Sequence, residues 1–460
     1  MKNTLEIKYL DLYEEIKMKI ENGEFSEDEK LPPIRSLATS KKLNPATVVR
    51  AYNLLEKNGY IYKILGSGSF VSRLKKLNIY DENKIELLNQ IDFSSTAPSE
   101  NLLPIKEFQE MLNYSIDNYS PNIFTYQNSQ GDIELREFIV NKYFPKSSIK
   151  SDNILIISGA QQGLDIISKA VLKRDDLIVT EELSYFGAIK LFKSSNVNIV
   201  KIPLESDGYD LIYFENILKK KKVKLAYINT NFHNPTGICW SESKINKMIE
   251  LSEKYNFLII EDDAISEINF KNLDLKNFIF KKSKDNIFYL KSFSKIFMPG
   301  IRIAFAVVPD KFVDIVISQK YIADIQTSGL TQKSFLEFMK KGYLDKHIKN
   351  INLEYGKRFD VLTDCLKKLN FVEFPFENNG GLYFWLSLKE IEDSNSFYNF
   401  CLKNGVAFMP GKYFGEKNSK FLRLCTASLD EKNIIQGIKK IEINYNSFLN
   451  KTENKNIPII

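Results

Sequence analysis

The segment Lys291–Phe305 (KSFSKIFMPGIRIAF) places an amine, two hydroxyls and a guanidinium within a short stretch of chain. These groups belong to Ser292, Ser294, Lys295 and Arg302. A lysine amine can form an imine with an aldehyde, and nearby hydroxyls and cations can hold a phosphate carried by the same molecule. A lysine in a lysine-rich chain is usually a solvated charge, so Lys295 needs support from other motifs.

Four further motifs place ligand-binding groups beside predicted strands and helices. Ser158-Gly159-Ala160-Gln161-Gln162 follows an apolar run and opens a helix, whose first amides suit a phosphate. The others are Tyr185, Asn234-Pro235-Thr236-Gly237 and Glu261-Asp262-Asp263. Each has a plain alternative: a tight turn, a core tyrosine, a second turn, and an acidic strand end that faces solvent. Only the set together indicates a site.

The elements that must position these groups are predicted from about residue 91 onward. Apolar runs rich in β-branched residues alternate there with amphipathic stretches, which predicts an α/β fold with a buried, mostly parallel sheet. Ligands of such sheets lie at the carboxyl ends of the strands. The last part of the chain predicts a smaller α+β subdomain. The seven predicted strands are 154–157, 177–180, 197–202, 225–229, 257–260, 287–290 and 304–308.

In chain order, these motifs resemble those of fold-type I aminotransferases, which bind pyridoxal 5'-phosphate (PLP). The resemblance implies that Lys295 forms the imine with PLP, and that Asp262 pairs with the pyridinium nitrogen. It also implies that Asn234 bonds the phenolic oxygen and that Arg423, in FLRLCTAS, clamps a substrate α-carboxylate. Tyr126 resembles the tyrosine that reaches the phosphate of the partner subunit. The remaining implied cofactor residues are Gly159, Ala160, Gln161, Tyr185 (stacked on the ring), Ser292, Ser294 and Arg302.

The sequence departs from this family pattern just after the predicted ring-binding aspartate. The family usually has a tyrosine two or three residues later, where this chain has Ala264 and Ile265. That tyrosine supports the phenolic oxygen, so its absence predicts poor transamination while leaving cofactor binding in place. Lys291 also stands where many relatives have a small residue.

The first 73 residues predict a separate domain. Apolar residues spaced by three and four predict a helix over 5–21, and Pro33–Thr39 fits a short second helix. Pro45–Lys57 predicts a third helix with Asn44 as its N-cap and Pro45 at its first position. Two short strands, 60–64 and 69–72, flank a glycine-rich tip. This order predicts a winged helix-turn-helix.

Positive charge is concentrated in this region, with nine basic residues and one acidic residue between Lys30 and Lys75, a net +8. The simpler interpretation of this charge is a solvated surface, and the more specific one is a surface that contacts phosphates. LPPIRSLA, NPATVVRAY and LGSGSFV resemble the GntR-type winged helix. Many relatives carry arginine at the position of Pro45, so the details of base recognition differ here. The resemblance implies DNA contacts from Arg35, Asn44, Ala46, Thr47, Arg50, Gly66 and Gly68.

Together, the two halves resemble the MocR family of bacterial regulators. That resemblance implies a head-to-tail homodimer that binds a double-stranded DNA operator and senses PLP or a small amino compound through an aldimine at Lys295. Two rivals remain open. One is an aminotransferase enzyme with an appended DNA-binding domain, and the other is a repressor whose large domain is a dimerisation scaffold without cofactor.

Bulk properties agree with a chain of several domains. Its 460 residues exceed one ordinary core, and we expect a winged helix over 1–73, a linker over 74–90 and the PLP-binding domain over 91–460, with its large part at 91–330 and its small part at 331–460. The four cysteines form no CxxC pair, which favours a reducing cytoplasm. The sequence lacks an apolar run long enough for a membrane span, and two histidines make a histidine-rich metal site unexpected.

Overall fold

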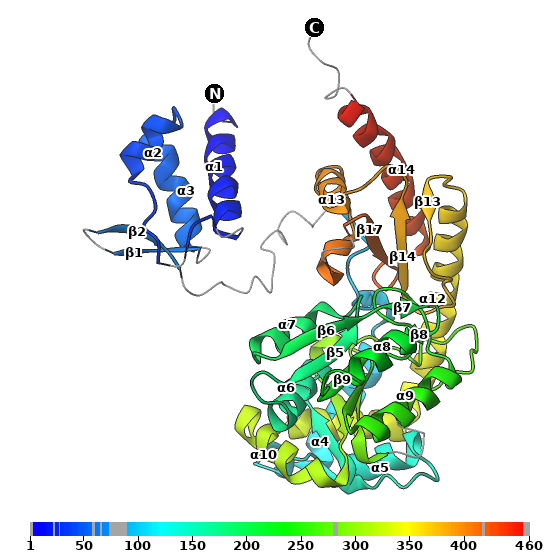
Figure 1. Cartoon of the computed structure of the whole chain (residues 1–460). Coiled ribbons are helices and arrows are strands. Elements are labelled where there is room, and N and C mark those ends of the chain that lie inside the picture. The colour runs from blue at the N-terminus through cyan, green and yellow to red at the C-terminus, as the bar shows by residue number, and fades with distance from the viewer. Residues whose placement is uncertain are drawn as a thin grey trace. The chain divides into compact units, whose positions relative to one another are not determined.

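The structure, a computed structural model, describes residues 3–21, 24–26, 28–57, 60–64, 67–72, 90–278, 284–415 and 419–453. The chain divides into two compact units, Met1–Leu88 and Asn89–Ile460 (Figure 1). Of the expected linker 74–90, only Gln90 lies within the described residues. None of the helices described is both long and apolar enough to cross a bilayer.

The N-terminal unit is a three-helix domain with a β-hairpin. It contains α1 (Asn3–Glu21), α2 (Ile34–Ser40), α3 (Pro45–Lys57), β1 (Ile61–Ile64) and the antiparallel β2 (Gly68–Val71). The predicted winged helix-turn-helix is confirmed, with boundaries that shift by one or two residues. Its core is made by residues spaced three and four apart on the helices, including Leu12, Ile16, Val48, Tyr52 and Leu55, and by Ile61 and Val71, which pair across the hairpin.

A seven-stranded sheet forms the centre of the second unit. Its order is β4-β12-β11-β10-β9-β5-β6, and β12 alone runs antiparallel to its neighbours. Each predicted apolar run becomes one of these strands. Their bounds are β4 (Ile154–Ile157), β5 (Leu177–Glu181), β6 (Asn198–Ile202), β9 (Leu225–Ile228), β10 (Leu258–Asp263), β11 (Ile287–Ser292) and β12 (Ala304–Val307).

Except at the edge strand β6, where Asn198 and Lys201 are exposed, both faces of this sheet are buried, which explains why its strands read as continuous apolar runs rather than as alternating ones. Ile154 and Ile156 belong to one core, and Leu155 and Ile157 belong to another. A small hairpin, β7 (Leu204–Glu205) with β8 (Gly208–Tyr209), follows β6. The accompanying helices are α4 (Ile105–Tyr119), α5 (Ile133–Tyr143), α6 (Ala160–Val171), α7 (Phe186–Ser194), α8 (Leu211–Leu218), α9 (Glu242–Tyr255), α10 (Val313–Asp324) and α11 (Gly329–Lys340).

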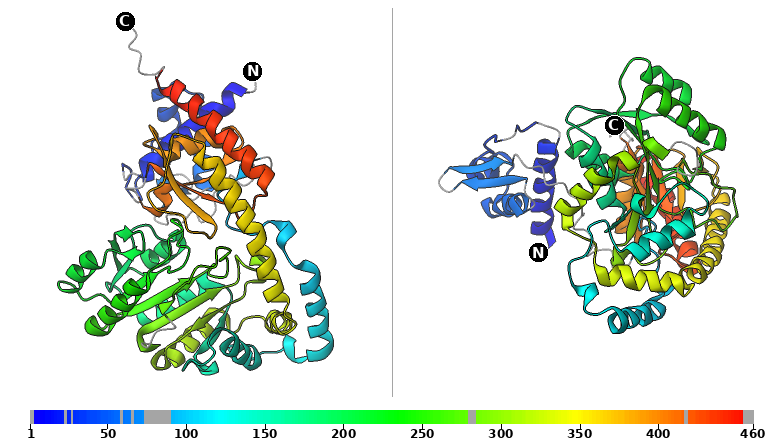
Figure 2. Two further views of the ribbon diagram at one scale, coloured as in Figure 1. Left: turned by 90° about the vertical axis from the view of Figure 1, so that its right-hand side faces the viewer. Right: turned by 90° about the horizontal axis from the view of Figure 1, so that it is seen from below.

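The C-terminal part is a second, smaller layer of sheet and helices. Its antiparallel sheet has the order β13-β14-β17-β16, from β13 (Val372–Glu373), β14 (Tyr383–Leu388), β16 (Met409–Pro410) and β17 (Phe421–Cys425). The helices α13 (Ser394–Lys403) and α14 (Glu431–Glu453) pack there. The long helix α12 (Tyr343–Lys367) joins the two parts, as Figure 2 shows in yellow, because Leu344 and Ile351 lie in the central core while Leu362 and Leu366 lie in the C-terminal core.

Contacts within this unit cross the division that is expected at about residue 330. β3 (Ile91–Asp92) pairs with β15 (Val406–Ala407), so the unit begins in its C-terminal part. In contrast, Phe335 and Phe338 of α11 belong to the central core, beyond the expected boundary at residue 330. Pairing between segments more than 300 residues apart leaves no periodic signal in the sequence.

Candidate functional site

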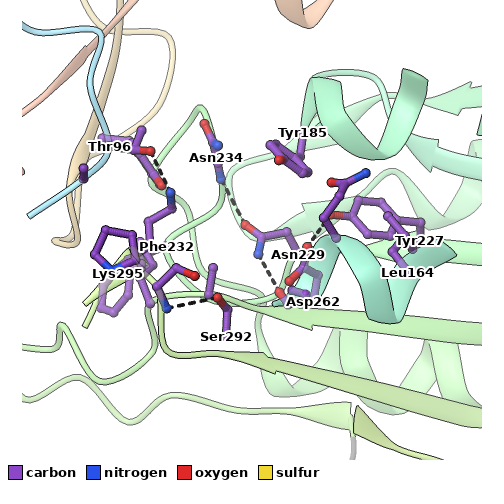
Figure 3. Close-up of a pocket in the computed structure, with 18 of the residues that line it drawn as sticks. Thr96, Leu164, Tyr185, Tyr227, Asn229, Phe232, Asn234, Asp262, Ser292 and Lys295 are labelled. Carbon is purple, nitrogen blue, oxygen red and sulfur yellow. Dashed lines mark hydrogen bonds between the residues drawn. The ribbon is translucent and has the colours of Figure 1, made fainter. Parts of the chain in front are cut away.

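Nine of the predicted cofactor residues line one cavity of about 300 Å³ (Figure 3). They come from the carboxyl ends of β10 and β11, the start of α6, and the segments that follow β5 and β9. This is the edge at which parallel sheets bind ligands. The nine residues are Ala160, Gln161, Tyr185, Asn234, Asp262, Ser292, Ser294, Lys295 and Arg302.

Asp262 lines the cavity and is only 9% exposed. Its Oδ2 accepts a hydrogen bond of 2.6 Å from the Tyr227 hydroxyl, and its backbone oxygen accepts one of 2.6 Å from Asn229 Nδ2. Its Oδ1 has no partner among the described residues. Burial raises the pKa of Asp262 to about 6, and the Tyr227 hydrogen bond opposes this rise. An N–H donor on a ligand fits the unpartnered oxygen.

The N-terminus of α6 contributes a cradle to the same cavity. Gly159 caps this helix at φ +98°, and a Cβ there would lie 2.0 Å from Nη2 of Arg302. Arg302 donates from Nη2 to the Ser158 carbonyl at 3.1 Å and from Nη1 to Ser294 Oγ at 3.3 Å. Free helix-terminal amides, a hydroxyl and a guanidinium around one point suit a phosphate.

Lys295 lines the same cavity as these two groups of residues. Its Nζ donates a hydrogen bond of 2.6 Å to Thr96 Oγ1. Burial lowers the pKa of Lys295 to about 8, and the positive charges of Arg423 and Arg302 lower it further against the opposing effects of Cys425 and Asp262. A larger share of this amine is therefore neutral and nucleophilic near neutral pH than for an exposed lysine.

Arg423 sits behind the cavity wall and does not line the cavity. It is 1% exposed and donates from Nη1 to Asn234 Oδ1 at 2.9 Å and from Nη2 to the Ser94 carbonyl at 2.7 Å. Asn234 in turn is held by Asn229, whose Oδ1 accepts from the Asn234 backbone N–H at 3.0 Å. The Nε of Arg423 has no hydrogen-bond partner among the described residues.

Sequence reasoning missed several cavity residues, of which Thr96, Tyr227, Asn229 and Tyr383 carry polar groups. Tyr227 and Asn229 lie at the carboxyl end of a predicted strand, two residues apart, and this signal could have found them. Thr96 and Tyr383 come from segments far away in the sequence. Ala264 and Ile265 also line the cavity, so its wall is apolar where the family tyrosine would stand.

Tyr126 does not line this cavity. Its side chain is 83% exposed, and the neighbouring Phe124 is 62% exposed. The prediction that Tyr126 serves the partner subunit stays a prediction.

The described DNA-contact candidates lie on the surface of the N-terminal unit, with one exception. Arg35, Asn44, Ala46, Arg50 and Gly68 are exposed, and Gly66 lies outside the described residues. Asn44 caps α3, since its Oδ1 accepts from the Ala46 backbone N–H at 2.8 Å. Thr47 is only 4% exposed, so little of its surface is available to DNA in this structure, and its DNA contact stays a prediction. The helical repeat turns Thr47 inward with Val48, toward the domain core.

Comparisons with known proteins give the same two parts. Residues 89–441 match the family described as aminotransferase class I and II, and residues 8–71 match the bacterial regulatory proteins of the gntR family. The uncharacterized HTH-type transcriptional regulator YisV of Bacillus subtilis is 28% identical over 92% of this chain and 93% of its own length. The HTH-type transcriptional regulator NorG of Staphylococcus aureus is 26% identical over 90% of this chain and 98% of its own length.

Solved structures resemble the second unit. The kynurenine aminotransferase of Pyrococcus horikoshii has a TM-score of 0.74 with 28% identity, over 79% of this chain and 93% of its own. The α-aminoadipate aminotransferase LysN of Thermus thermophilus has a TM-score of 0.74 with 25% identity, over 81% and 96%. The chain therefore belongs to the aminotransferase class I and II family and carries a gntR-type regulatory domain at its N-terminus, the arrangement of the MocR-type regulators that its sequence resembles.

Proposed function

We propose that this protein is a DNA-binding transcription regulator whose second unit holds PLP on Lys295 and responds to PLP or to an amino compound. One observation carries the proposal. Lys295 lines the same cavity as Asp262, whose Oδ1 has no partner among the described residues, and as Ala160, Ser294 and Arg302 of the phosphate cradle at α6. The residues present fit PLP, since Asp262 Oδ1 matches its ring nitrogen and the cradle at α6 matches its phosphate. LysN, the solved relative from Thermus thermophilus, is complexed with N-(5'-phosphopyridoxyl)-L-leucine.

Each group has a defined task in this proposal. PLP supplies an aldehyde that reacts with amines and a ring that accepts electrons. Lys295 provides the nucleophilic amine, and Asp262 Oδ1 would accept a hydrogen bond from the protonated ring nitrogen. Tyr185 lines the cavity where an aromatic ring can stack on the cofactor, and Asn234 faces it with an amide. Arg302 and Ser294 hold the phosphate with the first amides of α6.

An amino compound would be sensed through the contacts that Thr96 and Ser94 make. Thr96 accepts the hydrogen bond of Lys295, and the Ser94 carbonyl accepts that of Arg423. Both residues follow β3, which belongs to the C-terminal part. A ligand that binds Lys295 or Arg423 in place of Thr96 or Ser94 breaks the corresponding hydrogen bond. The C-terminal part then favours a different position. Such a ligand changes the populations of the two positions of the C-terminal part only if it binds one position more tightly than the other.

Efficient aminotransferase turnover is disfavoured by the wall of the cavity. Ala264 and Ile265 offer no hydroxyl to the phenolic oxygen of the cofactor. We therefore expect binding and exchange of amines rather than rapid transfer of amino groups to keto acids. Steady turnover with an amino donor and a keto-acid acceptor would favour the enzyme instead.

The regulator would act in the cytoplasm as a head-to-tail homodimer on a double-stranded operator. The exposed aromatic side chains of Phe124 and Tyr126 support dimerisation, because a partner subunit would cover them. Two gntR-type units in one dimer would contact paired half-sites.

Absorbance and DNA binding test the proposal together. Addition of PLP to the purified chain should produce a visible band that Lys295→Ala lacks. Binding to a duplex from the protein's own upstream region should then change when PLP, or PLP with candidate amines, is present. A colourless protein would refute the cofactor, and DNA binding that never responds would refute the sensing.

A further inference from the structure

Helix α3 has two faces that differ sharply in burial. Val48, Ala51, Tyr52 and Leu55 are at most 1% exposed and pack into the core of the N-terminal unit. Tyr52 fixes this face by donating its hydroxyl to the Pro32 carbonyl at 2.7 Å. The opposite face is therefore the one turned outward, and it can approach a partner without disturbing the fold.

The outer face carries Ala46, Val49, Arg50 and Asn53, which recur at three- and four-residue spacing. Val49 is 37% exposed. A single exposed valine is ordinary on a protein surface. Here, however, it adjoins Ala46 one turn earlier, so two short apolar side chains form a patch beside the helix N-terminus. The first turn of this helix contains no acidic residue.

Charge around the patch favours DNA as its occupant. Arg35 and Arg50 are exposed, and neither has an ion-pair partner within the described ranges. Lys42 is also exposed on the turn that precedes α3. Unpaired cations that flank a helix suit phosphates on either side of a groove. The patch between them would then face the edges of the bases.

We propose that Val49, with Ala46, reads the C5-methyl group of thymine in the major groove, and that Val49 sets base preference in the operator. This rests on the proposed DNA binding and assigns a base to a side chain. Among the major-groove edges, thymine alone presents a methyl group, and small apolar side chains contact it. Their shortness also lets the helix approach closely. Arg50, on the same face, is left to contact a phosphate or a guanine.

The test removes single methyl groups from DNA. Full-length protein is used to select duplexes from a random pool, and the enriched duplex is resynthesised with deoxyuridine in place of each thymidine in turn. Uracil pairs as thymine does but lacks the methyl group. At the contacted position, the change should weaken wild-type binding about four-fold, which corresponds to about 0.8 kcal/mol for one buried methyl. In Val49→Ala, the same change should have almost no effect.

A matched variant separates this contact from a general loss of affinity. Leu10→Ala shortens another exposed apolar side chain of the unit, on α1, and it should keep the full four-fold effect. Equal sensitivity to uracil in wild type and Val49→Ala would overturn the inference while leaving DNA binding intact. A selection that enriches no sequence would also overturn it. Failure to bind any DNA would instead remove the proposed function, and the inference with it.

Discussion

At the scale of single residues, the second unit is defined by an amine whose surroundings make it reactive. Burial and the charges of two arginines lower the pKa of Lys295 below that of an ordinary lysine. Oδ1 of Asp262 has no hydrogen-bond partner among the described residues. A residue with a purely structural role would be held in a fully paired, charged state, and neither group is held in that way. Perturbed groups that face one cavity are typical of functional sites.

The pKa of Lys295 predicts how attachment of PLP depends on pH. The protonated amine is not nucleophilic, so the rate should rise as pH increases toward about 8 and level off above it. An exposed lysine would continue to gain reactivity to about pH 10.4. The rate is followed by the visible band, and borohydride reduction with peptide mass analysis locates the pyridoxyl group. Attachment at another lysine, or a rate that still rises well above pH 8, would contradict the assignment.

Tyr227 is predicted to keep Asp262 ionised. Its hydroxyl donates to Oδ2, and the loss of a hydrogen bond to a buried charge costs about 1.5–3 kcal/mol. Tyr227→Phe should therefore raise the pKa of Asp262 from about 6 by a further 1 to 2 pH units. Affinity for PLP, which falls when Asp262 is protonated, should then begin to fall at a higher pH. Tyr209→Phe removes another buried hydroxyl, one that donates to the Tyr227 carbonyl, and should leave the pH profile in place.

At the scale of elements, the turn into α6 must have no side chain at Gly159. Its φ of +98° with ψ of 153° is a conformation reserved for glycine, and a Cβ there meets Arg302. Gly159→Ala should cost on the order of 1–3 kcal/mol of stability, visible as a lower melting temperature. By displacing Arg302, it should also weaken binding of PLP about ten-fold more than binding of pyridoxal, which lacks the phosphate.

Gly300→Ala is the control for this change, because nothing lies within 4 Å of a Cβ at that position. It should alter neither the melting temperature nor the preference for the phosphorylated ligand. An equal loss of PLP and pyridoxal binding in Gly159→Ala would place the phosphate elsewhere.

The elements differ in how far the sequence predicts them, and the difference has a physical basis. Strands buried on both faces leave continuous apolar runs, so β4 to β12 of the central sheet could be read directly. Asn44 and Pro45 likewise mark the start of α3. The pairing of β3 with β15, and the arrival of Thr96 at Lys295, depend on contacts between distant segments that leave no local pattern. Thr47 is expected at the DNA surface because it stands in the first turn of α3, whereas the helical repeat turns it inward.

At the scale of the whole molecule, regulation requires that two units with separate cores influence one another. Such coupling is a free energy shared by both ligands, so it is reciprocal. If PLP changes affinity for the upstream duplex by some factor, the duplex must change affinity for PLP by the same factor. Coupling between sites is typically 1–3 kcal/mol, so we expect a factor of about 5 to 150.

The two factors can be measured independently on the full-length chain. Titration of fluorescent duplex with and without saturating PLP gives the first, and titration of PLP by absorbance with and without duplex gives the second. Lys295→Ala should bind the duplex with an affinity that PLP no longer changes, since the cofactor cannot attach. Factors of one in both titrations would show that the units act separately. In that case the second unit would have no part in regulation or would act as an enzyme. A sensor must bind its ligand with different affinities in the DNA-bound and DNA-free states.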